Sequence, residues 1–366
     1  MSNKIVFVST NIMFSGSEIL LIKTAVPLSR LLDVYVYTKY QCNNLQNDET
    51  NNINFYNFSQ KNTYVNKIKN RLLRKTYDLK LNLLKIKPSL VVISQGGPMD
   101  SLVEMEICMQ LELKYIVINQ LVSSYHWTQF SDSLLIRFQN AYLKAQSVYF
   151  VSILNEKLFK VFFGENFISI QINNPISLKH HEYVSYPDTS TYKIAFVGRI
   201  EFFHKGLDLL IEVLRNPVWA TRNIEFNFYG SGPHEKILLE IIKRYELKFC
   251  FFKKHTNDLV GLWSQNHIGV LPSRFEGKSL AITEAMSLGR GVIATNVGGV
   301  LEQIEDGASG FVCENFTIES LTETLERAWE NRFNWEKIGV NAREKFLKDN
   351  TVTPEEILVN HIKSLI

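Results

Sequence analysis

The stretch at residues 272–286 reads PSRFEGKSLAITEAM and directly follows a short apolar run, IGVL. The apolar run is typical of a buried strand, Gly277 breaks the pattern, and Ser279 can cap a helix with apolar residues at helical spacing. This strand, turn and helix place one carboxylate, Glu276, in the turn and a second, Glu284, in the helix. Because a helix N-terminus attracts anions, we expect carboxylates held beside it to bind hydroxyl groups.

Neither of these two carboxylates has a local cationic partner, so we expect both to be unpaired. Two unpaired carboxylates beside an anion site suit a ligand that carries both hydroxyl groups and phosphate. A nucleotide sugar has this chemistry and is the first hypothesis for the ligand.

Length, composition and charge narrow the class of protein. The chain has 366 residues, which suits two domains of ordinary size, and 45% of its residues are hydrophobic, as in soluble globular proteins. Its net charge of +3 says little about partners, and we expect no nucleic acid among them. Four widely spaced cysteines, the lack of a signal-peptide pattern and the lack of an apolar window of ~18 residues predict a cytoplasmic protein.

Short apolar runs alternate with helical patterns along the whole chain. The runs IVFV at residues 5–8, LVVI at 90–93 and IAFV at 194–197 show no polar alternation, which is typical of strands buried on both faces. The alternation predicts an α/β fold with two doubly wound parallel sheets, each of them Rossmann-like.

The predicted domains are residues 1–175 and 193–349, joined by a linker at 176–192 that lacks apolar periodicity. In such sheets ligands bind beyond the carboxyl ends of the strands. The residues expected at these ends are Gly16, Arg199, Gly230, Glu276 and Gly298. The first of them, Gly16, either only turns the chain or lets the backbone approach a phosphate.

Two cations bracket the loop after the first strand of the second domain. Arg199 follows Gly198, and Lys205 precedes Gly206. Each cation alone would be read as solvated surface charge. Together, a guanidinium and an ammonium at this edge would neutralise a diphosphate and stabilise the charge on a leaving oxygen.

The second half of the chain resembles the retaining glycosyltransferases of family 4, a group 1 type with the two-Rossmann GT-B architecture. The matching residues are VGR at 197–199, KG at 205–206, YGSGP at 229–233, EGKSLAITE at 276–284 and GG at 298–299. In the first half, GSE at 16–18 is a weaker match. The resemblance implies a central cleft between the domains and a carboxyl-terminal helix, within 350–366, that completes the first domain.

The resemblance also implies a role for each matching residue. Glu276 would bind the donor sugar, Glu284 the ribose, and Arg199 and Lys205 the diphosphate, so that Glu276, Arg199 and Lys205 form the catalytic set. The rest of the donor cradle would be Gly16, Gly230, Gly277, Lys278, Ser279 and Leu280, with the base received at Lys253, Lys254 and His255.

The implied reaction transfers a sugar from a UDP- or GDP-sugar to an acceptor hydroxyl with retained configuration. Front-face attack would be assisted by the departing phosphate, with no metal and no other cofactor. Two departures from the family pattern stand out. Many members carry a histidine near the sugar, where this chain has Gln120 or, six residues on, His126. Lys278-Ser279 stands where the family often has Phe-Gly, which adds a charge beside the donor.

The stretch at residues 61–87 contains nine basic residues and one acid. Its leucines recur at helical spacing, which indicates a surface helix that packs them on the sheet. The alternative is a peripheral contact with anionic lipid at the inner face of a membrane.

The acceptor is identified only by analogy with the family. A glycan or a lipid-linked acceptor is implied, in the synthesis of surface polysaccharide, lipopolysaccharide or glycolipid. Two alternatives stay open: an epimerase-like enzyme that processes nucleotide sugars, and a non-catalytic nucleotide-sugar-binding module. The module would be expected to lack Arg199, Lys205 or Glu276, and all three are present.

Overall fold

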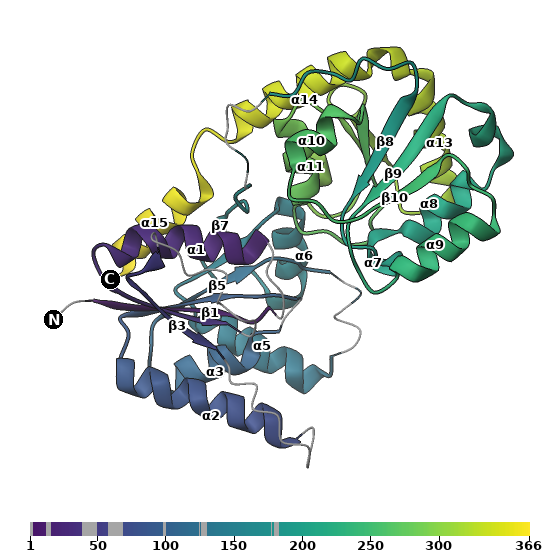
Figure 1. The fold of residues 1–366 in the computed structure, drawn as a ribbon. Helices are drawn as coiled ribbons and strands as arrows, with labels where there is room; N and C mark the ends of the chain where they lie inside the picture. The colour runs from purple at the N-terminus through teal and green to yellow at the C-terminus, as the bar shows by residue number, and fades with distance from the viewer. Residues whose placement is uncertain are drawn as a thin grey trace. The chain divides into compact units, whose positions relative to one another are not determined.

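The structure is a computed structural model of the chain, which divides into two compact units (Figure 1). Unit 1 contains Met1–Pro175 and Val352–Ile366, and unit 2 contains Ile176–Thr351. The described residues are 3–11, 16–38, 50–57, 69–97, 100–123, 125, 130–176, 178 and 183–366, with only the backbone described at 57 and 69–77.

Unit 1 is built on a seven-stranded parallel sheet with the strand order β3-β2-β1-β4-β5-β6-β7. The strands are β1 (Lys4–Ser9), β2 (Asp33–Thr38), β3 (Ile53–Asn57), β4 (Leu90–Ser94), β5 (Tyr115–Asn119), β6 (Ser147–Phe150) and β7 (Ser169–Gln171). The helices are α1 (Gly16–Ser29), α2 (Lys69–Ile86), α3 (Leu102–Gln110), α5 (Asp132–Lys144), α6 (Ile153–Phe163) and α15 (Pro354–Leu365).

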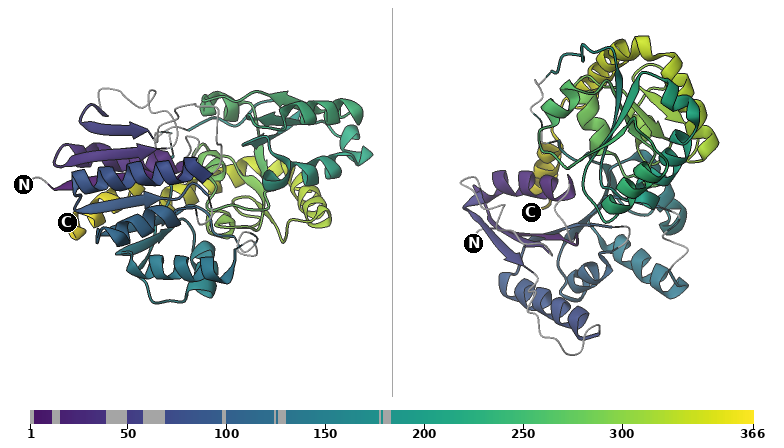
Figure 2. Two further views of the ribbon diagram at one scale, coloured as in Figure 1. Left: turned by 90° about the horizontal axis from the view of Figure 1, so that it is seen from below. Right: turned by 45° about the vertical axis from the view of Figure 1, so that its right-hand side comes forward.

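Helices cover both faces of this sheet, which is why its strands are continuous apolar runs. Successive residues of a strand point to opposite faces. Ile5 and Phe7 therefore pack in the core with α1 and α15, whereas Val6 and Val8 pack in the core with α2, α3, α5 and α6. The two helical layers lie on opposite sides of the sheet in Figures 1 and 2.

The last helix of the chain, α15, packs against α1 of unit 1 (Figure 2). Leu358 and Ile362 are fully buried in the same core as Leu20. The helix begins with a capping box, in which the Thr353 side chain accepts from the backbone of Glu356 and the Glu356 side chain accepts in return. No helix within the described ranges is long and apolar enough to cross a membrane.

Unit 2 is built on a six-stranded parallel sheet with the strand order β10-β9-β8-β11-β12-β13. The strands are β8 (Tyr192–Val197), β9 (Ile224–Tyr229), β10 (Cys250–Lys253), β11 (Ile268–Leu271), β12 (Val292–Thr295) and β13 (Phe311–Cys313). The helices are α7 (Phe202–Lys205), α8 (Leu207–Leu214), η2 (Pro217–Thr221), α9 (Glu235–Arg244), α10 (Leu259–Ser264), α11 (Leu280–Ser287), α12 (Val300–Gln303), α13 (Ile318–Glu330), η3 (Arg332–Asn334) and α14 (Trp335–Asp349).

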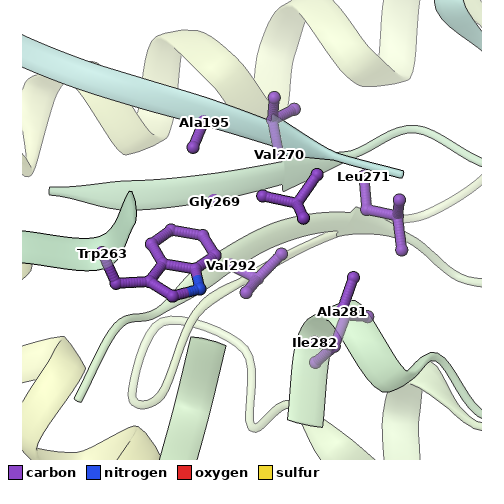
Figure 3. Close-up of a pocket in the computed structure, with 9 residues that line it drawn as sticks. Ala195, Trp263, Gly269, Val270, Leu271, Ala281, Ile282 and Val292 are labelled. Atoms are coloured by element: carbon purple, nitrogen blue, oxygen red, sulfur yellow. The ribbon is translucent and has the colours of Figure 1, made fainter. Parts of the chain in front are cut away.

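The core of unit 2 contains a small apolar cavity next to α11 (Figure 3). Ala281 and Ile282 of α11 line one side of it, and Val270 and Val292 of the sheet line the other, with the Trp263 ring at one end. Apolar and aromatic side chains surround this space, so it is a packing feature of the core and does not suit a charged ligand.

The described residues of the segment 176–192, which was expected to be a linker, contribute to the core of unit 2. Ile176 and Val184 are buried in this core. Nearby, the guanidinium of Arg290 donates to the backbone carbonyls of Val184 and Ser185 at 3.2 and 2.7 Å, and also to Trp263 and Asn266. The segment is therefore attached to unit 2 by packing and by a buried cation, which its lack of periodicity could not indicate.

We predict that Arg290→Met destabilises unit 2 by about 3–5 kcal/mol, because the substitution leaves several buried carbonyl groups without a donor. Arg290 is 1% exposed, and burial lowers its pKa to about 10, so the group is still charged at neutral pH. Urea unfolding followed by tryptophan fluorescence measures the change. Arg244→Met, on the exposed end of α9, is the matched control, and equal unfolding midpoints for the two variants would contradict the prediction.

Candidate functional site

The candidate site in unit 2 lies at the carboxyl ends of β8, β11 and β12. β8 and β11 are neighbours in the sheet, with Ile194 opposite Ile268 and Phe196 opposite Val270. The strand order reverses direction between them, since β9 follows on one side and β12 on the other. A reversal of this kind separates the loops at the carboxyl ends, so ligands of doubly wound sheets bind there.

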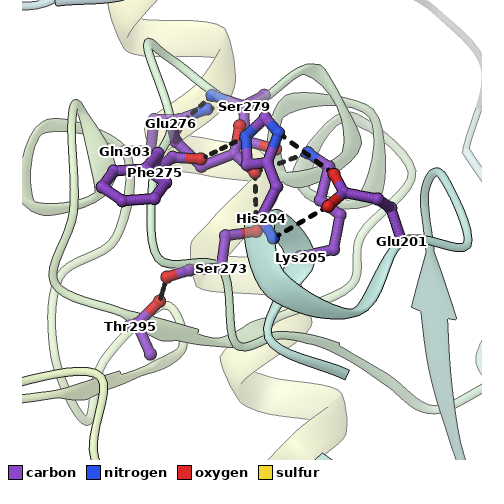
Figure 4. A network of polar contacts seen from close by, with 9 residues as sticks. All are labelled: Glu201, His204, Lys205, Ser273, Phe275, Glu276, Ser279, Thr295 and Gln303. Atoms are coloured by element: carbon purple, nitrogen blue, oxygen red, sulfur yellow. Dashed lines mark hydrogen bonds and ion pairs between the residues drawn. The ribbon is translucent and has the colours of Figure 1, made fainter. Parts of the chain in front are cut away.

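The loops after β8 and β11 are joined by an ion pair. Lys205 Nζ lies 2.7 Å from Glu276 Oε1, and the two side chains are only 17% and 10% exposed. Ser273 Oγ donates to the same carboxylate oxygen at 2.7 Å (Figure 4). Burial favours the neutral form of Glu276, but Lys205, Ser273 and His204 outweigh it and hold the pKa of this carboxyl below its usual value.

This ion pair corrects the expectation that both carboxylates are unpaired. The partner of Glu276 lies 71 positions earlier in the chain. Parallel pairing of β8 with β11 brings the two loops together, and no local feature of the sequence shows that contact.

His204 and Arg274 fasten the same two loops together. His204 Nε2 lies 2.8 Å from the carbonyl oxygen of Phe275, and the backbone N–H of Arg274 donates to the carbonyl of His204 at 2.9 Å (Figure 4). The Arg274 guanidinium also makes two hydrogen bonds of 2.7 Å to Asp208. Since a carbonyl can only accept, Nε2 carries the hydrogen of the His204 ring.

Two further residues of the site, His204 and Glu201, were not predicted from the sequence. Glu201 caps α7 by accepting from the backbone of His204 at 3.2 Å. Burial and then the charge of Lys205 lower the pKa of His204, so its ring gains a proton less readily than a free imidazole. The position of His204 directly before the predicted Lys205 was the only sequence signal for its role.

The turn after Glu276 is held from outside by β12 and α12. The N–H of Gly299 donates to the carbonyl of Gly277 at 2.7 Å, and Thr295 Oγ1 donates to the carbonyl of Ser273. Gly298 has a φ of 55°, and a Cβ atom there would lie 2.1 Å from the carbonyl oxygen of Glu276. Close approach of these two backbone segments therefore requires glycine at this position.

The side chain of Gln303 makes hydrogen bonds to both polar groups of the Ser279 backbone. It accepts from the Ser279 N–H at 3.2 Å and donates to the Ser279 carbonyl at 2.9 Å. Ser279 does precede α11 as expected, but its hydroxyl makes no capping bond to any described residue. The amide that was expected to join the phosphate cradle is thus already bonded to a side chain of α12.

Lys278 directs its charge to acidic groups of unit 2. Its ammonium lies 3.6 Å from a carboxylate oxygen of Glu302 on α12. Burial lowers the pKa of Lys278, while Glu302 and Asp349 oppose this shift. The charge that distinguishes this turn from the family pattern is therefore balanced by side chains of the same unit.

Glu284 lies in the second turn of α11 and differs from Glu276 in its surroundings. Its carboxylate has no hydrogen bond or ion pair to any residue that the structure describes. Burial raises the pKa of this carboxyl to about 7. A carboxyl that is half-protonated near neutral pH can change its charge when a ligand brings hydroxyl donors to it.

The other predicted site residues have the following positions. Arg199 is exposed and lies two residues after the end of β8, and Gly230 directly follows β9. Lys254 lines a cavity of about 230 Å³ together with Tyr229, Asp258 and Gln265. Gly277 follows Glu276, and Leu280 is the first residue of α11, directly after the Lys278-Ser279 pair. In unit 1, Gly16 begins α1 and Gln120 follows β5, whereas His126 lies outside the described residues.

Comparison with known proteins agrees with this arrangement. Residues 184–345 match the model of the family "Glycosyl transferases group 1". The match covers 162 of the 366 residues, all of them in unit 2. The matched residues include the ion pair of Lys205 and Glu276 and the second carboxylate, Glu284.

Curated relatives of the chain carry related names. An uncharacterised glycosyltransferase of Haemophilus influenzae is 28% identical over 261 residues, which cover 68% of this chain and 72% of that protein. The capsular polysaccharide biosynthesis glycosyltransferase CapM of Staphylococcus aureus is 26% identical over 185 residues, or 50% of this chain and 47% of CapM. The chain thus matches about half the length of CapM.

Solved structures resemble the chain over nearly its whole length. HepE of Anabaena in complex with UDP-glucose has a TM-score of 0.78 at 19% identity, with 99% of each chain covered. The lipopolysaccharide outer core galactosyltransferase WaaB has a TM-score of 0.73 at 16% identity, covering 99% of this chain and 100% of WaaB. These likenesses confirm the predicted fold class: two parallel-sheet α/β units, the GT-B fold.

We predict that Gly298→Ala lowers the free energy of unfolding by about 3 kcal/mol or more, because the new methyl group would collide with the Glu276 carbonyl. Gly307→Ala is the matched control. Gly307 also has a positive φ, 75°, but no atom lies within 4 Å of the position that a Cβ would take, so only about 1–2 kcal/mol of backbone strain is expected. Urea unfolding of both variants measures the two changes. Equal losses in the free energy of unfolding would contradict the close packing of Gly298 against the Glu276 carbonyl.

Proposed function

We propose that the chain is a retaining glycosyltransferase that moves a sugar from a UDP- or GDP-sugar to an acceptor hydroxyl. The observation that carries the proposal is the buried pair of Lys205 and Glu276 at the switch point of β8 and β11. An ammonium and a carboxylate held there match the two parts of a nucleotide sugar, its diphosphate and its sugar hydroxyls. Complexes of HepE with UDP and UDP-glucose support a donor of this kind.

Each charged group would have one task on the donor. Glu276 would accept hydrogen bonds from sugar hydroxyls, while Lys205 and the exposed Arg199 would neutralise the diphosphate. Glu284 would accept from the ribose hydroxyls. The base would lie near Lys254, and backbone of Gly230, Gly277, Lys278 and Leu280 would complete the part of the cradle that unit 2 provides.

The proposed step has front-face geometry. The acceptor oxygen bonds to the anomeric carbon as the bond from that carbon to the diphosphate oxygen breaks, and the acceptor proton passes to the departing phosphate oxygen. Negative charge builds on the diphosphate during this step. Lys205 and Arg199 would stabilise that charge, so the proposal requires no metal ion and no side-chain nucleophile.

The names of CapM and WaaB support a place in the synthesis of surface polysaccharide or lipopolysaccharide. We also propose that residues 61–87 contact an anionic membrane, on the basis of their nine basic residues. Residues 61–68 lie outside the described part of the chain, so charge composition is the support for this contact.

The test of the function is a screen of UDP- and GDP-sugars for hydrolysis in the absence of acceptor. We expect one base to be preferred, and the matching nucleoside diphosphate to raise the melting temperature at millimolar concentration. A protein that hydrolyses none of the donors, and whose melting temperature neither UDP nor GDP changes, would refute the proposal.

We predict that Glu276→Gln and Lys205→Met each lower kcat/KM for donor hydrolysis by at least about 100-fold, since each removes a charge that acts on the donor. Lys243→Met, the same chemical change on the exposed end of α9, is the control. Steady-state kinetics on the preferred donor measure the effect. Values of kcat/KM within a few-fold of wild type for both Glu276→Gln and Lys205→Met would contradict the roles assigned to these two residues.

We predict that nucleoside diphosphate binds up to about tenfold more tightly at pH 8 than at pH 6. The carboxyl of Glu284 has a pKa raised to about 7 by burial, and its ionised form is the better acceptor for ribose hydroxyls. Raising the pH through this value therefore favours binding. Isothermal titration calorimetry on wild type and on Glu284→Gln isolates the contribution, because the ligand's own phosphate titration is common to both.

The role of Glu284 would be excluded if Glu284→Gln showed the same pH dependence as wild type.

A further inference from the structure

The imidazole of His204 on α7 lies between two groups that can only accept hydrogen bonds. Its Nε2 lies 2.8 Å from the carbonyl oxygen of Phe275, and its Nδ1 lies 3.6 Å from Oε2 of Glu201 (Figure 4). The hydrogen of a neutral ring is then on Nε2, so Nδ1 presents a lone pair to a carboxylate. A second hydrogen, on Nδ1, would turn this contact into one between a donor and an acceptor.

This arrangement differs from that of two other histidines in unit 2. The Nδ1 atoms of His234 and His267 each accept a hydrogen bond from a backbone N–H at 3.0 Å. Protonation of either atom would place a hydrogen where the ring now accepts one, so that bond would be lost. Protonation of His204 preserves the existing bond at Nε2 and adds a donor at Nδ1.

The charges of the turn after β11 are balanced by partners close to the ring. Arg274 donates its backbone N–H to the carbonyl of His204, and its guanidinium lies 2.7 Å from Asp208 of α8. Glu276, in the same turn, is paired with Lys205. The side chain of His204 is 36% exposed, so a proton can reach the ring from solvent.

The Lys205 ammonium opposes a second hydrogen on the ring. Burial and then the charge of Lys205 lower the pKa of His204, while Glu276 and Glu201 oppose this shift. The hydrogen-bonding groups around the ring therefore suit an imidazolium, whereas burial and the neighbouring ammonium favour the neutral form.

Binding of a diphosphate at Lys205 would change this balance. The negative charges of the diphosphate would offset the ammonium, and a nearby anion favours the charged form of an imidazole. We infer that His204 takes up a proton from solvent when the diphosphate of the donor binds, and returns it when the nucleoside diphosphate leaves. The inference rests on the proposed function, because it requires the diphosphate at Lys205.

His204 is then a positioning residue, because it acts through Lys205 and through the two loops that it joins. The imidazolium would donate to Glu201 and to the Phe275 carbonyl, and such charge-assisted hydrogen bonds are stronger than those of a neutral ring. The loops after β8 and β11 would therefore be held more firmly while the donor is bound. The added positive charge would also stabilise the negative charge that builds on the diphosphate during transfer.

Proton uptake on binding fixes the sign of a pH dependence. A group whose pKa is higher in the complex than in the free chain makes binding tighter as the pH falls from the higher value to the lower. This effect is opposite to that expected of Glu284, whose ionised form binds better. His204→Gln should therefore show a larger gain in nucleotide affinity from pH 6 to pH 8 than the wild-type chain.

Isothermal titration calorimetry counts the protons directly. UDP and GDP are titrated into the full chain at pH 6 in MES and in Bis-Tris, two buffers whose enthalpies of ionisation differ. We expect the wild-type chain to take up about 0.3 proton or more per nucleotide beyond the value for His204→Gln. A glutamine Nε2 can still donate to the Phe275 carbonyl but does not titrate. Proton exchange by Glu284 and by the nucleotide phosphate is common to both chains.

Two further variants control this measurement. His361→Gln, the same change in α15 of unit 1, should leave the proton count as in wild type. Glu201→Gln still accepts the N–H that caps α7 but presents no charge to Nδ1, so it should take up fewer protons than wild type. This variant replaces His204→Gln if melting temperatures show that His204→Gln does not fold.

Proton NMR of the histidine Cε1–H signals identifies the group that titrates. The signal that is lost in His204→Gln should titrate with a midpoint about one pH unit or more higher when nucleotide is bound. Nucleotide binding with an unchanged midpoint, or with equal proton counts for wild type and the variant, would overturn the inference and leave the proposed function intact. Failure of both UDP and GDP to bind would refute the proposed function, and the inference with it.

Discussion

The ion pair between Lys205 and Glu276 depends on the parallel pairing of β8 with β11, and the rest of the unit 2 site depends on the ion pair. Removing two charges from water costs more than their attraction returns unless further hydrogen bonds complete both groups. Ser273 supplies one such bond, and the contacts of His204 and Arg274 fix the distance between the two loops. The Lys205 ammonium and the Glu276 carboxylate are therefore already oriented toward each other. A ligand that binds both groups can take the place of their mutual contact.

Two carboxylates of one turn and helix have opposite electrostatic environments. Cation and hydroxyl contacts lower the pKa of Glu276, whereas burial without a described partner raises that of Glu284. Although the two side chains are chemically alike, Glu276 is a permanent anion, whereas Glu284 gains its negative charge near neutral pH. Lys278, between them in the sequence, is balanced by Glu302 and adds little net charge to the turn.

The polar edges of the two units have different chemistry. The edge of unit 2 contains the ion pair of Lys205 and Glu276 and the carboxyl of Glu284, which titrates near neutral pH. These groups suit a diphosphate that carries hydroxyl groups at both of its ends. The described edge of unit 1 contains amides, hydroxyls and two hydrogen-bonded carboxylates, which suit neutral hydroxyl groups. The side chains that follow each strand therefore give the two edges different charge and hydrogen-bonding capacity.

Sequence alone predicted most of the fold, because a strand buried on both faces must be a continuous apolar run. That condition located β1, β4 and β8. It did not locate β7 and β13, which are edge strands of three residues with the sequences SIQ and FVC. The types of residue at the carboxyl ends of the strands also indicated a site for phosphate and hydroxyl groups.

Contacts between distant segments were decided only by the tertiary structure. The sequence placed Glu276 in a turn but could not show that Lys205, 71 residues away, is its partner, or that Gln303 bonds the Ser279 backbone. Nor could it show that Arg290 holds residues 184 and 185 to unit 2. Local patterns record which face of an element is buried. Partners across a sheet depend on strand order and register, which form only when the whole chain packs.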